Sequence, residues 1–230
     1  MTGRAGVVIV FAKAPRPGQV KTRMAPPLTN EQAAELYAHL LDDVLELTVH
    51  AARSTGLEPV LAVHPPEACD ELERRAPAGY RVVPQRGDDL AARMSAAVED
   101  VVAAGAQRIL LRGSDSPVLS EATLSAALSA LESVDLVFCP DFDGGYSLVG
   151  LCGATPGLFA HPMSTASVLT DTLANATKLG LSYHVLAPSF DLDTIEDLKW
   201  LARARRQNST GTCVKTLDFI DREDLWRHLK

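Results

Sequence analysis

A run of seven apolar residues at 6–12 constrains this chain more than any other feature of its sequence. The run is far shorter than the ~18 residues that a membrane-spanning helix needs. It also lacks the polar alternation of a half-exposed strand, so we predict a strand that is buried on both faces. Four later segments have a similar texture, at residues 58–64, 80–84, 108–112 and 134–140. Such strands are typical of parallel sheets.

Amphipathic stretches separate these strands. The clearest is residues 30–53, where Thr29 and Gln32 form a capping box and apolar residues recur at helical spacing. Further helices are expected at 88–104, 120–132 and 167–179, and a last one after Thr194. Strands are expected at 146–151 and 181–187, the first of which need not be parallel to the rest. Alternating strands and helices predict a three-layer, Rossmann-like α/β fold with a mostly parallel sheet.

The composition of the chain argues against some classes of function. The chain has 230 residues and a formal net charge of −7, which argues against a general nucleic-acid binder. We expect one nucleotide-binding domain at 1–207, a tail at 208–230 with a short amphipathic end, no membrane span, and a cytoplasmic location. Its four cysteines form no C-x-x-C pair, so neither zinc nor disulfides are indicated. The oligomeric state is left open.

Basic residues gather directly after the first strand. The loop at 13–23 contains Lys13, Arg16, Lys21 and Arg23, with Gly18 between them. Loops at the carboxyl ends of parallel strands form ligand sites, and Gly18 permits a positive φ or a close phosphate. We therefore predict a phosphate site at Lys13, Gly18, Lys21 and Arg23, against the alternative of a solvated basic loop. The spacing is not that of a P-loop.

Acidic residues follow two later strands. In the loop at 113–117, Asp115 is a candidate ligand for Mg²⁺ or Mn²⁺, and Gly113 and Ser114 are candidate phosphate contacts. The alternative for Asp115 is a turn or a helix cap. In the loop at 191–198, alternation along an extended segment leads us to expect only one of Asp191 and Asp193 to face the cleft, and we favour Asp193 as the second metal ligand.

A glycine pair marks the remaining candidate segment. Asp143 precedes Gly144 and Gly145, and Tyr146 follows them. In isolation, Asp-Gly indicates a tight hairpin turn. The functional interpretation is an acceptor site, in which the glycines admit a bulky ligand and an aspartate accepts a hydrogen bond or a proton from it.

The joint order of these motifs resembles a family of glycosyltransferase-A-like proteins, some of which are labelled arsenosugar-biosynthesis glycosyltransferases. The likeness covers about residues 7–201 and rests on the segments at 11–24, 113–117, 143–146, 164–165 and 191–198. The segments at 21–24 and 191–198 are more distantly similar to phospholactate and molybdenum-cofactor guanylyltransferases. The resemblance implies the nucleotide-diphospho-sugar transferase (GT-A) fold, with Asp115 at the position of its metal-binding aspartate. The chain departs from many relatives at Ala91-Ala92, where they have Gly-Glu, and at Ser116, where they often have cysteine.

Together these features predict a metal-dependent transferase with Lys21, Asp115 and Asp143 as catalytic residues. The preferred version is glycosyl transfer from a nucleotide sugar to a small-molecule acceptor. The first alternative is a guanylyltransferase-like enzyme that acts on a phosphorylated small acid, uses a nucleoside triphosphate and releases pyrophosphate. The second is a nucleotide-binding protein without catalysis.

Overall fold

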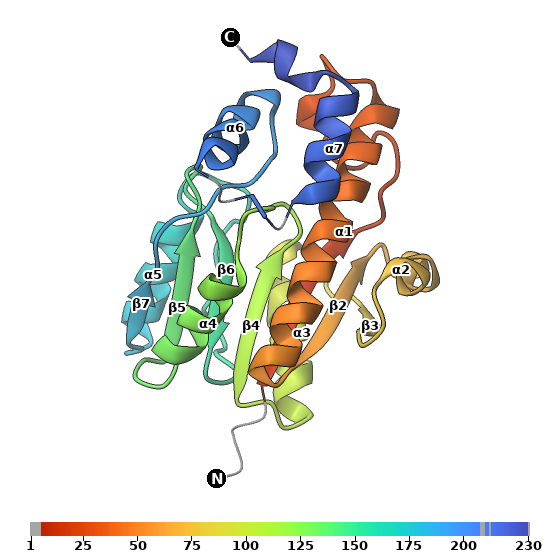
Figure 1. Ribbon diagram of the computed structural model, residues 1–230. Coiled ribbons are helices and arrows are strands. Elements are labelled where there is room, and N and C mark those ends of the chain that lie inside the picture. The colour runs from red at the N-terminus through yellow and green to blue at the C-terminus, as the bar shows by residue number, and fades with distance from the viewer. Residues whose placement is uncertain (1–5, 208–209, 212, 230) are drawn as a thin grey trace.

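A computed structural model describes residues 6–207, 210–211 and 213–229. Its sheet has seven strands in the order β3-β2-β1-β4-β6-β5-β7 (Figure 1), and all neighbours are parallel except that β6 is antiparallel to β4 and β5. The strands are β1 Gly6–Lys13, β2 Leu57–His64, β3 Arg81–Pro84, β4 Arg108–Gly113, β5 Leu136–Pro140, β6 Tyr146–Leu151 and β7 Tyr183–Val185. The mostly parallel sheet predicted from the sequence is confirmed.

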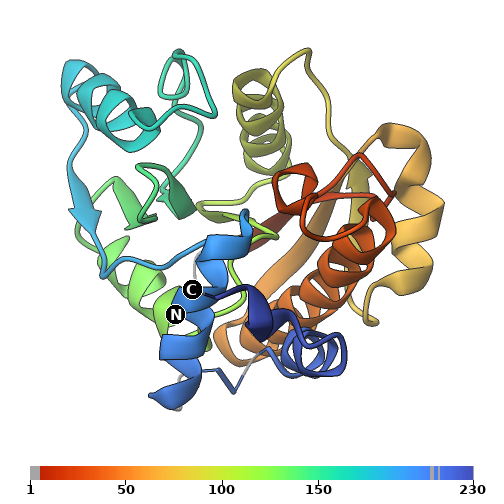
Figure 2. The same cartoon turned by 90° about the horizontal axis from the view of Figure 1, so that it is seen from above.

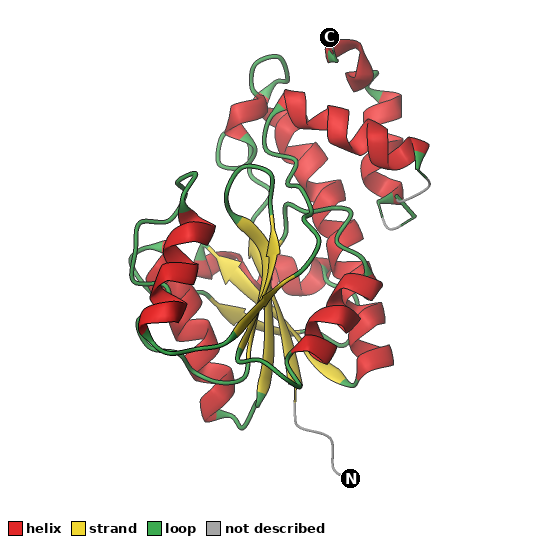
Figure 3. Cartoon of the chain, turned by 90° about the vertical axis from the view of Figure 1, so that its left-hand side faces the viewer, coloured by secondary structure: helices red, strands yellow, loops and turns green. Residues whose placement is uncertain are grey.

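Helices cover both faces of this sheet, which gives three layers (Figure 3). Alternate residues of β1 point to opposite faces, so Val8 and Val10 pack toward α1 and α4 while Val7 and Ile9 pack toward α3 and α5. The helices are α1 Asn30–Thr55, α2 Cys69–Arg75, α3 Leu90–Ala103, α4 Glu121–Ala130, α5 Val168–Lys178, α6 Leu198–Arg206 and α7 Val214–Arg222.

Capping residues begin two elements where the sequence predicts. Thr29 and Gln32 form the expected capping box at the start of α1. Thr194 and Asp197 form another, although the turn that follows is a 3-10 segment at Ile195–Asp197 before α6 begins. The strand expected at 181–187 is shorter than predicted, since only Tyr183–Val185 pairs with β5 as β7.

Helices α2 and α7 are not predicted from the sequence. Helix α7 lies in the segment expected to be a tail, of which residues 208, 209, 212 and 230 are outside the described residues. It packs beside α1 (Figures 1 and 2). Its amino end is capped by Asp43 of α1, which accepts hydrogen bonds from the backbone N–H of Lys215 (3.1 Å) and Thr216 (2.8 Å). Because this cap comes from a distant helix, no local motif announces α7.

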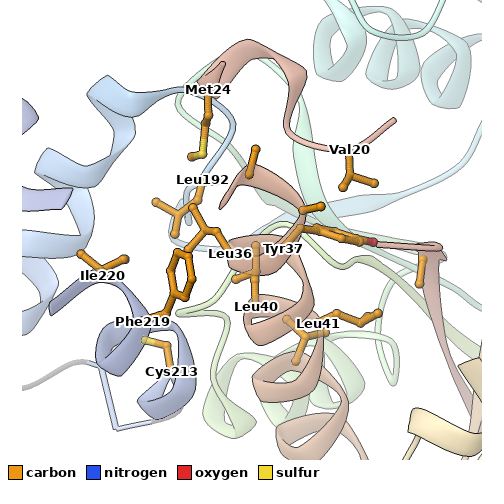
Figure 4. Close-up of a cluster of buried hydrophobic side chains, with 14 of the residues drawn as sticks. Val20, Met24, Leu36, Tyr37, Leu40, Leu41, Leu192, Cys213, Phe219 and Ile220 are labelled. Carbon is orange, nitrogen blue, oxygen red and sulfur yellow. The ribbon is translucent and has the colours of Figure 1, made fainter. Parts of the chain in front are cut away.

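The core extends from the sheet to the loops that carry the predicted site. Val20 and Met24, from the loop after β1, and Leu192, from the segment before α6, are buried with apolar residues of α1 (Figure 4). These anchors fix the intervening polar residues, so the positions of the loops follow from apolar burial. Within the described ranges, no helix has both the length and the apolar character required to cross a membrane.

Candidate active site

The predicted loops meet in a cleft of about 820 Å³. It lies beyond the carboxyl ends of β1 and β4 and the amino end of β6, which reaches the same edge because β6 is antiparallel. In open, mostly parallel sheets, ligands bind beyond this edge. Ten of the candidate site residues from the sequence line the cleft, namely Lys13, Lys21, Arg23, Gly113, Ser114, Asp115, Asp143, Gly145, Tyr146 and Asp193.

The ammonium group of Lys21 joins two of these loops. Its Nζ donates to Oδ1 of Asp193 at 3.0 Å and is also hydrogen-bonded to Oδ1 of Asp115. The Lys21 side chain is only 3% exposed, against 38% for Asp115 and 37% for Asp193. Burial by itself lowers the pKa of Lys21, but the two carboxylates outweigh it, and the pKa is raised. Lys21 is therefore a buried cation that is already paired on both sides.

The backbone of the first loop aims Lys21 inward. Lys21 adopts a left-handed conformation with φ 48°, between the buried Val20 and a short 3-10 turn at Thr22–Met24. Arg23 points to the rim, where its side chain is 67% exposed and its Nη1 lies 3.5 Å from Oδ2 of Asp193. Gly18 has the positive φ that the sequence suggested, at 72°, but it does not line the cleft.

The expectation that only one of Asp191 and Asp193 faces the cleft is wrong, because both line it. In an extended segment, residues two apart share a face, and it is the intervening Leu192 that points away into the core. Asp191 accepts a hydrogen bond from the hydroxyl of Ser116, and Asp193 faces Lys21. The alternation thus places two carboxylates, not one, beside Asp115.

Burial and the repulsion between neighbouring carboxylates raise the pKa of two carboxyl groups in the cleft, those of Asp141 and Asp191. Asp141 is 8% exposed, and burial, followed by the charges of Asp143 and Asp193, raises its pKa to about 7. Burial and the neighbouring Asp141 and Asp115 likewise raise the pKa of Asp191 well above its usual value. For Asp193 burial acts in the same direction, but Lys21 and Arg23 outweigh it and lower the pKa. Asp193 is therefore held ionised beside two more readily protonated carboxyls.

Two residues that no sequence motif marks, Arg112 and Tyr37, support the loop after β4. Arg112 is fully buried, and its guanidinium donates to the carbonyl of Ser116 at 3.0 Å and to Oγ1 of Thr48 at 3.1 Å. Tyr37 of α1 shares a hydrogen bond of 2.8 Å with Oγ of Ser114 and accepts one of 3.0 Å from the backbone N–H of Lys13. Arg112 and Tyr37 each connect segments that are far apart in the sequence, so no local sequence pattern predicts their roles. Ser114 is thereby engaged within the protein.

The segment at 143–146 forms the tight turn between β5 and β6. Oδ1 of Asp143 accepts a hydrogen bond from the backbone N–H of Gly145 at 3.0 Å, as in an ordinary Asp-Gly turn. Asp143, Gly145 and Tyr146 also line the cleft, so the turn and the site coincide. Gly144 differs from the acceptor role proposed for it: it does not line the cleft and has a φ of 94°.

Gly144 instead admits another part of the backbone. A Cβ at this position would lie 2.0 Å from the carbonyl oxygen of Ala166. Ala166 belongs to the segment at 163–166, which lines the cleft. We expect Gly144→Ala to destabilise the fold by at least the roughly 1–3 kcal/mol of a strained backbone residue and to displace this segment. Urea denaturation measures the change, with Gly153→Ala as the control, because Gly153 has open space around it. Equal stability of the two variants would contradict this explanation.

The donor set near Lys21 fits a hard divalent cation. Asp115 and Asp193 already place carboxylate oxygens around one cation, the Lys21 ammonium. Among the residues that the structure describes, no group of three or more histidine, cysteine, aspartate or glutamate side chains is arranged to hold a metal. Mg²⁺ commonly uses one or two carboxylates and completes its shell with water and substrate phosphates. The pair therefore fits a metal that is bound together with a phosphate donor.

Comparison with known proteins places this geometry in context. Residues 47–165, just over half of the chain, match the family described as "Uncharacterized protein conserved in bacteria (DUF2064)". A phosphoenolpyruvate guanylyltransferase from Chloroflexus aggregans (strain MD-66 / DSM 9485) is 30% identical over 132 residues, which cover 56% of this chain and 64% of that protein. The chain thus spans slightly less than two thirds of this relative.

Solved structures identify the fold. A candidate nucleotide-diphospho-sugar transferase from Desulfovibrio desulfuricans G20 superposes with a TM-score of 0.85 at 28% identity, over 96% of both chains. The 4-diphosphocytidyl-2C-methyl-D-erythritol synthase from Anaerococcus prevotii DSM 20548 gives a TM-score of 0.59 at 12% identity, over 89% of this chain and 97% of that one. The chain therefore has the nucleotide-diphospho-sugar transferase fold that the resemblance implied.

Proposed function

The chain belongs to the DUF2064 family, and we propose that it is a metal-dependent nucleotidyltransferase that uses a nucleoside triphosphate and an anionic small-molecule acceptor. The guanylyltransferase relative favours nucleotidyl transfer over the glycosyl transfer preferred from the sequence. Glycosyl transfer becomes the second candidate.

The observation that carries this proposal is the meeting of three loops at Lys21. Asp115 and Asp193 lie 94 and 172 residues beyond Lys21 in the sequence, and the three side chains form one ion-paired group in the cleft. A structural ion pair alone has no need of a cleft, whereas a phosphate-transfer site needs carboxylates for a metal beside cations for phosphate. The ion-paired group of Lys21, Asp115 and Asp193 therefore supports a phosphate-transfer site rather than a structural ion pair.

In the proposed reaction, an oxygen of the acceptor attacks the α-phosphorus of the triphosphate. The bond from that phosphorus to the oxygen bridging to the β-phosphate breaks, and pyrophosphate leaves with the bonding electrons. Asp115 and Asp193 would hold Mg²⁺ or Mn²⁺, and the ion would supply positive charge to stabilise the phosphate oxygens. Lys21 and Arg23 contribute positive charge on the side of the cleft formed by the first loop, and the wall formed by Asp143, Gly145 and Tyr146 faces the acceptor.

Asp143 separates the two candidate reactions. A phosphate or carboxylate acceptor is already ionised at neutral pH, so nucleotidyl transfer to it needs no general base. A sugar or alcohol hydroxyl must lose a proton, and Asp143 is an exposed carboxylate of the cleft that could accept it. This placement is the specific observation that keeps glycosyl transfer as the second candidate.

The experiment is a donor panel with Mg²⁺ or Mn²⁺ and small phosphorylated acids such as phosphoenolpyruvate. We expect metal-dependent release of pyrophosphate from one nucleoside triphosphate, measured by a coupled phosphatase assay, and a loss of less than tenfold in Asp143→Asn. Turnover of a nucleotide sugar without pyrophosphate release, with a loss of at least a hundredfold in Asp143→Asn, would favour glycosyl transfer. Binding of donors in thermal-shift assays without turnover of any would support the non-catalytic alternative.

A further inference from the structure

A second chamber of about 800 Å³ adjoins the cleft. Its walls are the carboxyl end of β2, the amino end of α3 and the segment before α5. It shares six lining residues with the cleft, namely Lys13, Gln19, Leu90, Arg93, Met163 and Ser164. The cleft and the chamber therefore form one continuous space, and a ligand held at Lys21 has room to extend into the chamber.

Positive charge in this chamber has no paired carboxylate. Two cationic side chains, Lys13 and Arg93, line it beside the imidazole of His64, and among the described residues none of the three is within ion-pair distance of an aspartate or glutamate. Lys21, by contrast, is paired with two carboxylates. In an acidic protein, unpaired cations that share a cavity indicate an anion site. The unpaired charge of this region thus lies in the chamber rather than at Lys21.

The geometry of Arg93 suits an anion ligand. Its Nε donates to the carbonyl oxygen of Asp89 at 3.1 Å, which holds the guanidinium near the start of α3 without using its terminal nitrogens. The Asp89 side chain is occupied as the cap of α3, because its Oδ1 accepts from the backbone N–H of Ala92 at 2.8 Å. Asp88 also lines the chamber, but among the ion pairs of the described residues none joins it to Arg93. A guanidinium held in this way is preorganised for phosphate.

His64 lies close enough to Arg93 and Lys13 for their charges to influence its pKa. Burial, followed by the charges of Arg93 and Lys13, lowers its pKa, and Glu67 opposes this shift more weakly. An anion that binds beside Arg93 and Lys13 would cancel their repulsion, so the pKa of His64 would rise. The imidazole therefore serves as a probe of occupancy.

We propose that the chamber binds a phosphate-bearing group of a substrate through Lys13, His64 and Arg93. The proposal deepens the proposed function and rests on it for the identity of that group, which is either the leaving pyrophosphate of the triphosphate or the phosphate of the acceptor. In this arrangement Lys21 holds Asp115 and Asp193 in place, while Lys13 and Arg93 of the chamber supply positive charge for the leaving pyrophosphate or the phosphate of the acceptor.

The test titrates the full chain with inorganic pyrophosphate and, in a separate arm, with phosphoenolpyruvate, by calorimetry and by NMR of His64. Loss of a charge-assisted hydrogen bond in Arg93→Ala is expected to weaken binding about tenfold or more, and Arg93→Lys to retain part of it. The control Arg86→Ala is expected to change affinity by less than about twofold, because Arg86 lies outside both cavities and pairs with Asp100.

The outcomes separate this proposal from the proposed function. A rise in the pKa of His64 together with Arg93-dependent binding supports the chamber, and the arm that shows both identifies the source of the phosphate. Equal affinity of wild type and Arg93→Ala in both arms, or an unchanged His64 pKa at saturation, overturns it. Since neither measurement needs turnover, Arg93-dependent binding without pyrophosphate release from any donor would reject nucleotidyl transfer and leave the chamber standing.

Discussion

Asp115→Asn is expected to lower kcat/KM at least about a hundredfold, because one preorganised electrostatic group contributes roughly 3 kcal/mol to a transition state. The substitution keeps the size of the side chain and removes the charge that pairs with Lys21 and would hold the metal. Asp193 remains on Lys21 at 3.0 Å, so the ammonium is not left unpaired. The measurement is initial-rate kinetics with the donor identified by the panel, at saturating Mg²⁺ or Mn²⁺.

The control for this prediction is Asp218→Asn, which removes an exposed carboxylate on α7 outside the cleft. Its kcat/KM should stay within about twofold of wild type, since long-range effects of exposed charges are screened. Thermal unfolding of both variants tests for a loss of folded protein. Activity of Asp115→Asn within tenfold of wild type, with normal folding, would exclude Asp115 from the role proposed for it.

Much of this site can be predicted from the sequence, because its residues lie directly after predicted strands. Lys21, Asp115 and Asp193 each follow a segment read as a strand, and the carboxyl ends of parallel strands meet at one edge. Their convergence thus follows from topology alone. The prediction that Asp191 points away from the cleft is wrong, because residues two apart on an extended segment share a face.

Other features had no local signal. Arg112 and Tyr37 act through partners on other elements, and Arg112 sits inside an otherwise apolar strand that predicts only burial. Asp43 caps the start of helix α7, although it lies 172 residues before Lys215, from whose backbone N–H it accepts a hydrogen bond. Gly144 resembles a ligand-admitting glycine in sequence, yet its neighbour is the backbone of Ala166. These features depend on tertiary contacts that one sequence does not encode as a motif.

Lys21→Met is expected to have opposite effects on metal affinity and on turnover. The ammonium of Lys21 holds the two carboxylates proposed as metal ligands, so in the donor-free protein a divalent cation must compete with it for their oxygens. Methionine has a similar length and no charge, which frees both oxygens. We expect Mn²⁺ to bind the donor-free variant at least about tenfold more tightly, since removing one opposing charge at this range is worth 1.4 kcal/mol or more.

Turnover of Lys21→Met should nevertheless fall about a hundredfold, because the variant loses a buried cation beside the donor site. The fold should survive, since Asp115 and Asp193 are 38% and 37% exposed and water can solvate the carboxylates that the variant leaves unpaired.

The matched control is Arg23→Met. Arg23 also contacts Asp193, but at 3.5 Å and with a side chain that is 67% exposed, so its charge is already screened by water. Mn²⁺ affinity in Arg23→Met should therefore change by less than about threefold. Electron paramagnetic resonance of free Mn²⁺ measures both variants without a donor. If Lys21→Met bound Mn²⁺ no more tightly than wild type, the ammonium would not occupy the metal position. Asp115 and Asp193 would then be reassigned as structural ion-pair partners of Lys21.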